Sequence, residues 1–175
     1  GNNDVVTDQV KCLEGLADAV NVTDGAGAKS HMSALATAAI LAQIGIEPIL
    51  QFTTRDRNRI AIQGDLLGSW ALNIPNILCL YGDEVSGGDQ PEAKEVRDLD
   101  TIGLLRTAHE IKVKKVYPSG RKIINAPEFF IGAADTPFKI NEDFDGANLR
   151  KKINAGVEFF QTQYAFDEDI LKNYM

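Results

Sequence analysis

The sequence predicts an α/β fold in which short apolar strands alternate with helices, and three observations lead to this. Five apolar segments of strand length end in small or polar residues, as buried parallel strands do. Helical patterns fill the gaps between them, and a strict alternation of strands and helices forms a parallel sheet with right-handed crossovers. The strand ends also recur at a fixed interval, since Thr23, Thr53 and Asp83 are each 30 residues apart.

The elements follow a first helix expected over residues 4–16. Strands are expected at residues 18–23, 47–53, 76–81, 129–134 and 157–163. Further helices are expected at residues 31–44, 57–73, 96–112, 146–155 and 167–174. Ser30 is placed to cap the helix over 31–44, and Gly45 to end it. A polar, basic insertion at residues 114–127 accounts for the longer interval before the fourth strand.

Two architectures fit this order, a (β/α)₈ TIM barrel and a doubly wound open sheet. A barrel needs eight strands and usually about 250 residues. This sequence of 175 residues offers five strands and begins in a helix with no leading strand. We therefore expect a single, partial TIM-barrel domain over residues 1–175, whose five strands are parallel neighbours in sequential order.

The composition argues against several classes of protein. Lys and Arg number 18 against 25 Asp and Glu, which gives a net charge of −7. Nucleic acid and anionic membranes are not expected partners, because both attract cationic surfaces. No apolar stretch reaches the roughly 18 residues of a spanning helix, and no signal segment is visible. Cys12 and Cys79 lack zinc or redox spacing and the two His lack ligand partners, so we expect no metal site and a cytoplasmic protein.

Polar residues follow every predicted strand, at the end where both architectures bind ligands. They are Thr23 and Asp24, Gln51 and Thr53, Asp83 and Glu84, Asp135, and Gln161 and Gln163. Because these ends meet at one edge of a parallel sheet, we predict a shared site there. In the helix over 146–155, Asn148 and Lys152 share a face with the preceding Asp145, and Lys151 lies nearer its edge. This face is either solvated or holds a ribose or phosphate group.

Two loops have more than one interpretation. Residues 24–30, Asp-Gly-Ala-Gly-Ala-Lys-Ser, end like a phosphate-binding loop, but Thr23 and Ala28 stand where the Walker pattern needs glycine. Their amides could still receive a phosphate before a helix. The segment Arg55-Asp-Arg-Asn-Arg59 is either a solvated loop or an anion site.

Several motifs, taken together in order, resemble the methylenetetrahydrofolate reductase family over nearly the whole chain. They are Val20-Asn-Val-Thr-Asp24, Ile49-Leu-Gln-Phe-Thr53, Ile77-Leu-Cys-Leu-Tyr-Gly-Asp83, Phe130-Ile-Gly-Ala-Ala134, Asn148-Leu-Arg-Lys-Lys-Ile-Asn-Ala-Gly156 and Phe160-Gln-Thr-Gln-Tyr-Ala-Phe166. The resemblance implies an eight-stranded barrel with bound FAD, of which this chain supplies strands two to six. It also implies that hydride passes from NAD(P)H through the flavin to 5,10-methylenetetrahydrofolate, giving 5-methyltetrahydrofolate in one-carbon metabolism.

The resemblance also assigns roles to residues. Asp83 matches an aspartate that lies near flavin and folate, and Gln163 matches a glutamine that binds the pterin. We therefore predict Asp83 as catalytic, and Gln163 with Asp83 as binding the folate substrate. The predicted cofactor-binding residues are Thr23, Gln51, Thr53, Gly82, Ala133, Asp135, Asp145, Asn148, Lys151 and Lys152.

The sequence departs from the family pattern at several positions. Tyr81 replaces an arginine before Gly-Asp, Gln51 stands where many members have His, and Asp135-Thr-Pro-Phe138 replaces a Tyr-Pro-x-x-His segment. The family's glutamate proton donor belongs to a first strand outside this chain, so we expect the chain alone to be inactive. Two alternative functions stay open: another folate- or pterin-binding barrel enzyme such as a methyltransferase, and a non-catalytic partner subunit. The expected protein partner is either a second copy of the chain, in a homo-oligomer, or a partner subunit.

Overall fold

The computed structural model describes residues 2–139 and 144–175. Five parallel strands form one sheet in the order β1-β2-β3-β4-β5, so every strand pairs with its neighbour in sequence. The strands are β1 (Val20–Val22), β2 (Pro48–Thr53), β3 (Asn76–Leu80), β4 (Phe130–Asp135) and β5 (Phe159–Thr162). No described strand is inserted out of order, which confirms the partial barrel and excludes the doubly wound sheet. The sheet curls as half of a barrel wall does.

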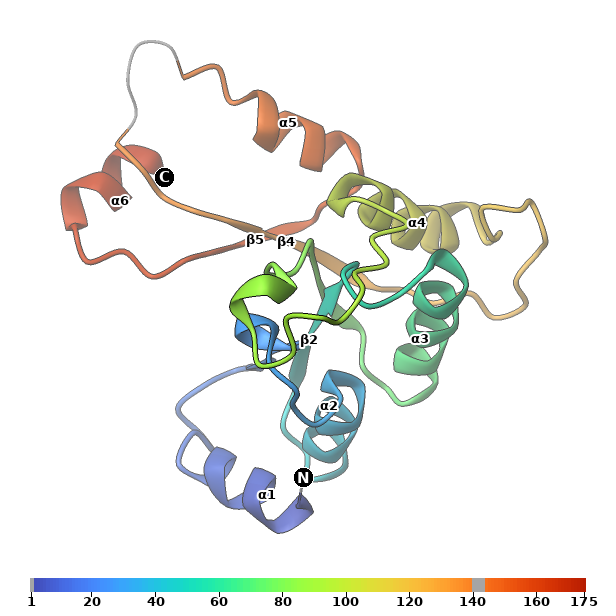
Figure 1. Ribbon diagram of the computed structural model, residues 1–175, viewed down its shortest axis with the longest axis horizontal. Coiled ribbons are helices and arrows are strands. Elements are labelled where there is room, and N and C mark those ends of the chain that lie inside the picture. Colours follow the sequence, from blue (N-terminus) through green and yellow to red (C-terminus); the bar gives the residue numbers. More distant parts are fainter. Residues whose placement is uncertain (1, 140–143) are drawn as a thin grey trace.

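The helices lie between the strands as the sequence predicts. They are α1 (Asn3–Lys11), α2 (Ala34–Gln43), α3 (Arg59–Ala71), α4 (Thr101–Lys114), α5 (Ala147–Asn154) and α6 (Glu168–Tyr174). Figure 1 shows α2, α3 and α4 following one another along one side of the curled sheet. Two short 3₁₀ turns, η1 (Ala26–Ala28) and η2 (Val85–Gly87), were not predicted.

The predicted cap of α2 is wrong. Ser33, rather than Ser30, occupies the N-cap, and its hydroxyl accepts from the Ala36 amide at 3.5 Å. Ser30 lies three residues before this cap and donates its amide to the Asp89 carboxylate at 3.2 Å. Gly45 does follow the helix in the left-handed region, at φ +82°, as predicted.

Two other helix boundaries also differ from the prediction. Helix α1 ends at Lys11 rather than at the predicted residue 16, and residues 12–16 form turns. Helix α4 begins only at Thr101, since Asp100 caps it by accepting from the Gly103 amide at 2.6 Å. The long stretch between β3 and α4 is thus free to form the irregular loop that borders the site.

The core lies between the sheet and the helices. Alternate residues of the strands face the helices and are fully or almost fully buried: Val22, Leu50, Phe52, Ile77, Cys79, Ile131 and Ala133. They pack against apolar side chains of α2, α3 and α4, and each such side chain contributes about 1.5–3 kcal/mol by its burial. Trp70 of α3 meets the Phe129 ring edge-on at 6.2 Å between centroids and so belongs to this packing.

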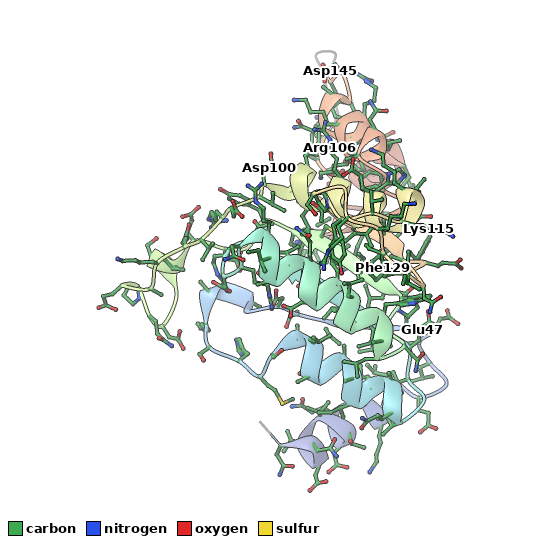
Figure 2. All side chains as sticks on the ribbon, turned by 90° about the vertical axis from the view of Figure 1, so that its right-hand side faces the viewer. Glu47, Asp100, Arg106, Lys115, Phe129 and Asp145 are labelled. Atoms are coloured by element: carbon green, nitrogen blue, oxygen red, sulfur yellow. The ribbon has the colours of Figure 1, made fainter. Side chains whose placement is uncertain are left out.

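Figure 2 shows which end of the sheet carries the site. Glu47 and Phe129, which immediately precede β2 and β4, lie on the same side of the molecule as Lys115, at the end of α4. Asp100, at the start of α4, lies on the other side. Helix α4 therefore runs antiparallel to the strands, and the strands end toward the side of Asp100.

Among the described residues, none of the helices is both long and apolar enough to cross a membrane.

Candidate functional site

A cavity of ≈ 280 Å³ lies where β2, β3, β4 and β5 end. Its lining comprises Asp24, Ala26, Gln51, Thr53, Leu78, Leu80, Tyr81, Gly82, Asp83, Ala134, Gln161, Thr162 and Gln163. Seven residues predicted for the site are among them: Asp24, Gln51, Thr53, Gly82, Asp83, Gln161 and Gln163. They come from four parts of the chain, and the parallel sheet brings them to one edge.

Asp24 anchors the floor of the cavity. Its side chain is 8% exposed, and its Oδ2 accepts from the Thr53 amide at 2.9 Å and from the Thr53 hydroxyl at 3.0 Å. The guanidinium of Arg57 binds the same carboxylate with both terminal nitrogens, at 2.6 Å and 3.2 Å. This bidentate pair ties the end of β1 to the end of β2 and to the start of α3. Asp24 is therefore a structural anchor of the site.

The three arginines after β2 are each paired with a carboxylate of the protein. The pairs are Arg55 with Asp56, Arg57 with Asp24, and Arg59 with Asp98. The Arg59 guanidinium also lowers the pKa of Asp98 to about 2 through its hydrogen bonds. The segment is therefore neither a fully solvated loop nor an anion site. Its three arginines form ion pairs within the protein.

Asp83 follows β3 through a glycine that the geometry requires. Gly82 has φ +90°, and a Cβ there would lie 3.0 Å from Cβ of Arg55 and 3.2 Å from Cβ of Thr53. Because Gly82 has no side chain, its backbone can lie close to Arg55 and Thr53 and turn sharply. Asp83 therefore lines the cavity while remaining exposed. Its Oδ2 accepts from the Gly27 amide at 2.7 Å.

The phosphate-loop-like segment 24–30 thus binds carboxylates of its own chain. Its backbone is left-handed at Gly25, Gly27 and Ala28, with φ of 58°, 64° and 52°, an arrangement that points amides toward an anion. One amide binds Asp83, and another, that of Ser30, binds Asp89. The loop after β1 and the loop after β3 are therefore joined through two carboxylates.

Sequence reasoning missed Arg97, in the loop between β3 and α4. Its guanidinium lies over the Tyr81 ring, 3.9 Å from the centroid, and donates to the carbonyl oxygens of Tyr81 at 3.0 Å, Gly82 at 3.3 Å and Asp83 at 3.4 Å. It also pairs with Glu95, whose pKa it lowers to about 2 by this hydrogen bond. No local pattern marks this arginine, because the carbonyl groups that it binds lie 14 to 16 residues earlier.

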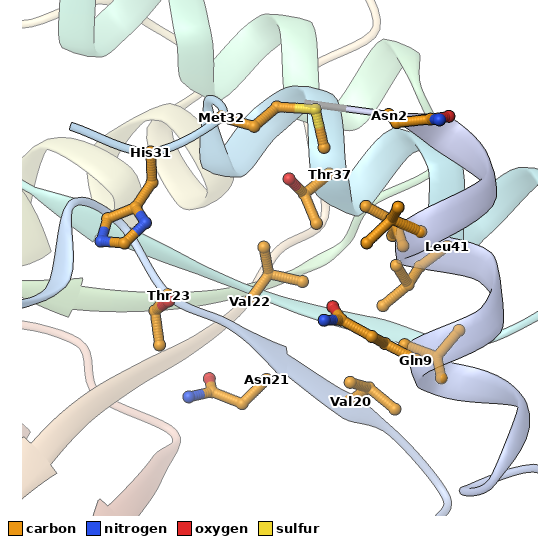
Figure 3. A pocket seen from close by; sticks show the side chains of 13 residues that line it. Asn2, Gln9, Val20, Asn21, Val22, Thr23, His31, Met32, Thr37 and Leu41 are labelled. Atoms are coloured by element: carbon orange, nitrogen blue, oxygen red, sulfur yellow. The ribbon is translucent and has the colours of Figure 1, made fainter.

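Thr23 lies beside a different cavity, of ≈ 470 Å³, between β1, α1 and α2. Figure 3 shows Thr23 with Asn21 and His31 at one side of this cavity and Gln9 of α1 at the other. Asn21 Oδ1 is buried, and the described residues give it no hydrogen-bond partner. The structure therefore does not bring Thr23 together with Gln51 and Asp83 around one cavity.

The predicted residues at the end of β4 take different positions. Ala133 is fully buried in the core facing the helices, and its neighbour Ala134 lines the cavity instead. Lys152 of α5 donates to the Ala134 carbonyl at 2.6 Å and lies 3.3 Å from Asp135 Oδ1. The other oxygen of Asp135 is buried without a partner among the described residues.

The remaining predicted cofactor residues lie on and before α5. Asp145 accepts from the Ala147 amide at 2.8 Å and so helps to start the helix. Asn148 and Lys151 are exposed, whereas Lys152 is partly buried against β4. The two lysines therefore differ in environment, and none of these side chains lines the cavity beside Asp83.

The cavity offers both donors and acceptors of hydrogen bonds. The amide side chains of Gln51, Gln161 and Gln163 can each donate and accept. The Asp83 carboxylate adds a negative charge at the same cavity. The described residues contain no cluster of three or more His, Cys, Asp or Glu able to hold a metal ion.

Comparison with protein-family models matches residues 3–175 to the family described as methylenetetrahydrofolate reductase. The match covers nearly all of the chain, including every strand and every loop of the cavity. A comparison with curated proteins gives no match.

Proposed function

This chain belongs to the methylenetetrahydrofolate reductase family, and we propose that its cavity serves hydride transfer to 5,10-methylenetetrahydrofolate. The reaction would run in two halves. NAD(P)H would supply the hydride and a bound FAD would carry it, and 5,10-methylenetetrahydrofolate would become 5-methyltetrahydrofolate by taking this hydride on the methylene carbon and one proton on the released N10. The chemistry of the second half demands a site that stabilises a cation, because the substrate opens to an iminium ion before it accepts hydride.

The observation that carries this proposal is the position of Asp83. Its carboxylate follows the buried strand β3, lines the cavity and is held at 2.7 Å by the Gly27 amide. A fixed negative charge of this kind favours a cationic intermediate without reorganising during the reaction. Gln163, which lines the same cavity, can both donate to and accept from the edge of the pterin ring.

The described residues also fit a flavin. Gln51 and Thr53 offer an amide and a hydroxyl at the cavity. Asp135 lies outside this cavity, beside Lys152, and its Oδ2 is a buried acceptor that a ribityl hydroxyl could satisfy. Lys151 and Lys152, with Asp145 and Asn148, would face the ribityl and phosphate groups. When bound, the flavin supplies the ring that carries hydride between the two halves.

The test uses Asp83→Asn in the full-length protein, with Asp89→Asn as the matched control. Both carboxylates lie on the loop after β3 and accept from amides of residues 24–30, but only Asp83 lines the cavity. Anaerobic stopped-flow absorbance follows flavin reduction by NAD(P)H and reoxidation by 5,10-methylenetetrahydrofolate separately.

We expect Asp83→Asn to slow reoxidation by about 10²-fold or more, the range for losing one preorganised electrostatic contact. Flavin reduction should change far less, because no folate cation forms in that half. Asp89→Asn should leave both rates close to those of the wild type. Equal slowing of both halves by Asp83→Asn, or of neither, would contradict the role of this carboxylate. A wild-type protein that retains no flavin would instead favour a non-catalytic or pterin-methyltransferase barrel.

A further inference from the structure

Arg97 holds one backbone segment of the site with an unusual number of bonds. A single guanidinium donates to three successive carbonyl oxygens, those of Tyr81, Gly82 and Asp83, at 3.0–3.4 Å. Its side chain is 12% exposed, and Glu95 pairs with its Nε and Nη2. The planar fork of an arginine can make such a set of bonds, whereas the ammonium of a lysine is a point donor on a flexible stem.

The backbone of Arg97 indicates that this placement carries a cost. Its φ is +41°, in the left-handed region that residues other than glycine seldom adopt. Its amide and that of Val96 both donate to the Arg55 carbonyl, at 3.4 Å and 2.7 Å, which fixes the turn. Strained backbone of this kind persists where surrounding contacts over-determine it, and it concentrates at functional sites.

The ring of Tyr81 gives Arg97 a further contact at the same strand end. Tyr81 stands directly before Gly82 and Asp83, and the Arg97 guanidinium covers its ring at 3.9 Å. The cation thus reaches this strand end from a later loop. A tyrosine face also attracts a guanidinium by its ring quadrupole.

We infer that Arg97 is a positioning residue for Asp83, and this inference rests on the proposed function of Asp83. The carbonyls that Arg97 binds belong to Asp83 and the two residues before it. Fixing them sets where the Asp83 side chain leaves the backbone, and therefore whether its carboxylate meets the Gly27 amide and faces the cavity. Arg97 acts through this backbone and does not line the cavity.

The test compares Arg97→Leu and Arg97→Lys with Arg121→Leu in the full-length protein. Arg121 is the matched control, because its guanidinium also lies over a tyrosine ring, that of Tyr117 at 4.2 Å, in the hairpin between α4 and β4. The lysine variant keeps the charge and loses the fork, so it separates geometry from charge. Each variant is also combined with Asp83→Asn.

We expect both Arg97 variants to slow flavin reoxidation by the folate about tenfold to a hundredfold, the cost of a misplaced group of about 1 Å. Flavin reduction by NAD(P)H should stay within about twofold of the wild type. In the Asp83→Asn background, Arg97→Leu should add less than about twofold, because both changes disable one contact. Equal slowing of both half-reactions, additive effects in the double variant, or wild-type rates in Arg97→Leu would each overturn the inference.

A second measurement does not depend on turnover. Hydrogen exchange of the peptide spanning residues 24–30 reports the Gly27 amide, which the Asp83 carboxylate protects. Arg97→Leu should speed this exchange, and Arg121→Leu should not. Unchanged exchange in Arg97→Leu would show that Arg97 does not position Asp83. A wild-type protein unable to reduce the folate would contradict the proposed function alone, since the exchange result stands without it.

Discussion

The Asp24–Arg57 pair predicts a large loss of stability from one substitution. Arg57→Met keeps most of the aliphatic length of the side chain beside Phe52 and removes the guanidinium. It leaves a carboxylate whose side chain is 8% exposed, with the amide and hydroxyl of Thr53 as its remaining donors. Breaking a buried pair by removing one partner costs about 3–5 kcal/mol. We expect about 3 kcal/mol, because the two Thr53 hydrogen bonds persist.

Urea unfolding followed by far-UV circular dichroism measures this loss in the full-length protein. With an m value of about 3 kcal/mol per molar, the unfolding midpoint falls by about 1 M. Arg59→Met is the control, since the Arg59–Asp98 pair has side chains 58% and 30% exposed. An exposed pair contributes about 0–1 kcal/mol, so this variant should unfold close to the wild type.

A double variant isolates the buried charge as the cause. Asn at position 24 is neutral, and its carbonyl oxygen can still accept from the Thr53 amide and hydroxyl. Asp24→Asn combined with Arg57→Met should therefore be more stable than Arg57→Met alone. The reasoning would be refuted if Arg57→Met cost no more than Arg59→Met, or if the double variant were the less stable of the two.

Three further outcomes are expected. Gly82→Ala should lower the free energy of unfolding by about 1–3 kcal/mol, because alanine is strained at φ +90° and its Cβ meets Arg55 and Thr53. Gly87→Ala is the control, because a Cβ at Gly87 meets open space. This variant should lose less stability than Gly82→Ala in the same thermal melt. Burial raises the pKa of Cys79 to about 12, so at pH 8 peptide mapping should find the exposed Cys12 alkylated and Cys79 unmodified until the protein is unfolded. Lys152→Met should reduce the flavin retained on gel filtration, because it removes the ammonium group at the end of β4. Unchanged flavin occupancy would remove that role.

Strand β3 shows why a strand could be predicted from the sequence, since its burial is nearly continuous. The segment predicted at 76–81 is Asn76–Leu80 in the structure, with Asn76, Ile77, Leu78 and Cys79 all buried. Such a run needs only local information, as does the glycine that ends a helix. The sequential order of the strands was predicted from the regular spacing of their ends together with the missing leading strand.

The contacts of the loops could not be predicted in the same way. Ser30 has the chemistry of an N-cap, but the helix begins three residues later than predicted, and the Ser30 amide binds Asp89, 59 residues away. Arg57 meets Asp24 across 33 residues, so a charged segment that looks solvated is in fact paired. These contacts depend on which loops the fold brings together, and single-sequence patterns carry no record of that.

The sequence predicted residues at the strand ends that line the cavity, but it did not predict Arg97, which binds the backbone around Asp83. Gln51, Asp83 and Gln163 line one cavity because they lie at or shortly beyond the carboxyl ends of parallel strands. The position of Ala133 shows the limit of this reasoning, since a shift of one residue moves a side chain to the other face of the sheet. Arg97 escaped notice because nothing in its neighbourhood distinguishes it from a solvated charge.

Product formation in a single turnover tests the central claim most directly. The full-length protein, reduced with NAD(P)H under anaerobic conditions and separated from excess reductant, is mixed with 5,10-methylenetetrahydrofolate. Flavin absorbance and mass spectrometry of the folate are then read on the same sample. The account predicts that flavin absorbance returns as 5-methyltetrahydrofolate appears in equal amount. A protein that binds flavin and is reduced, but yields no 5-methyltetrahydrofolate, would contradict it.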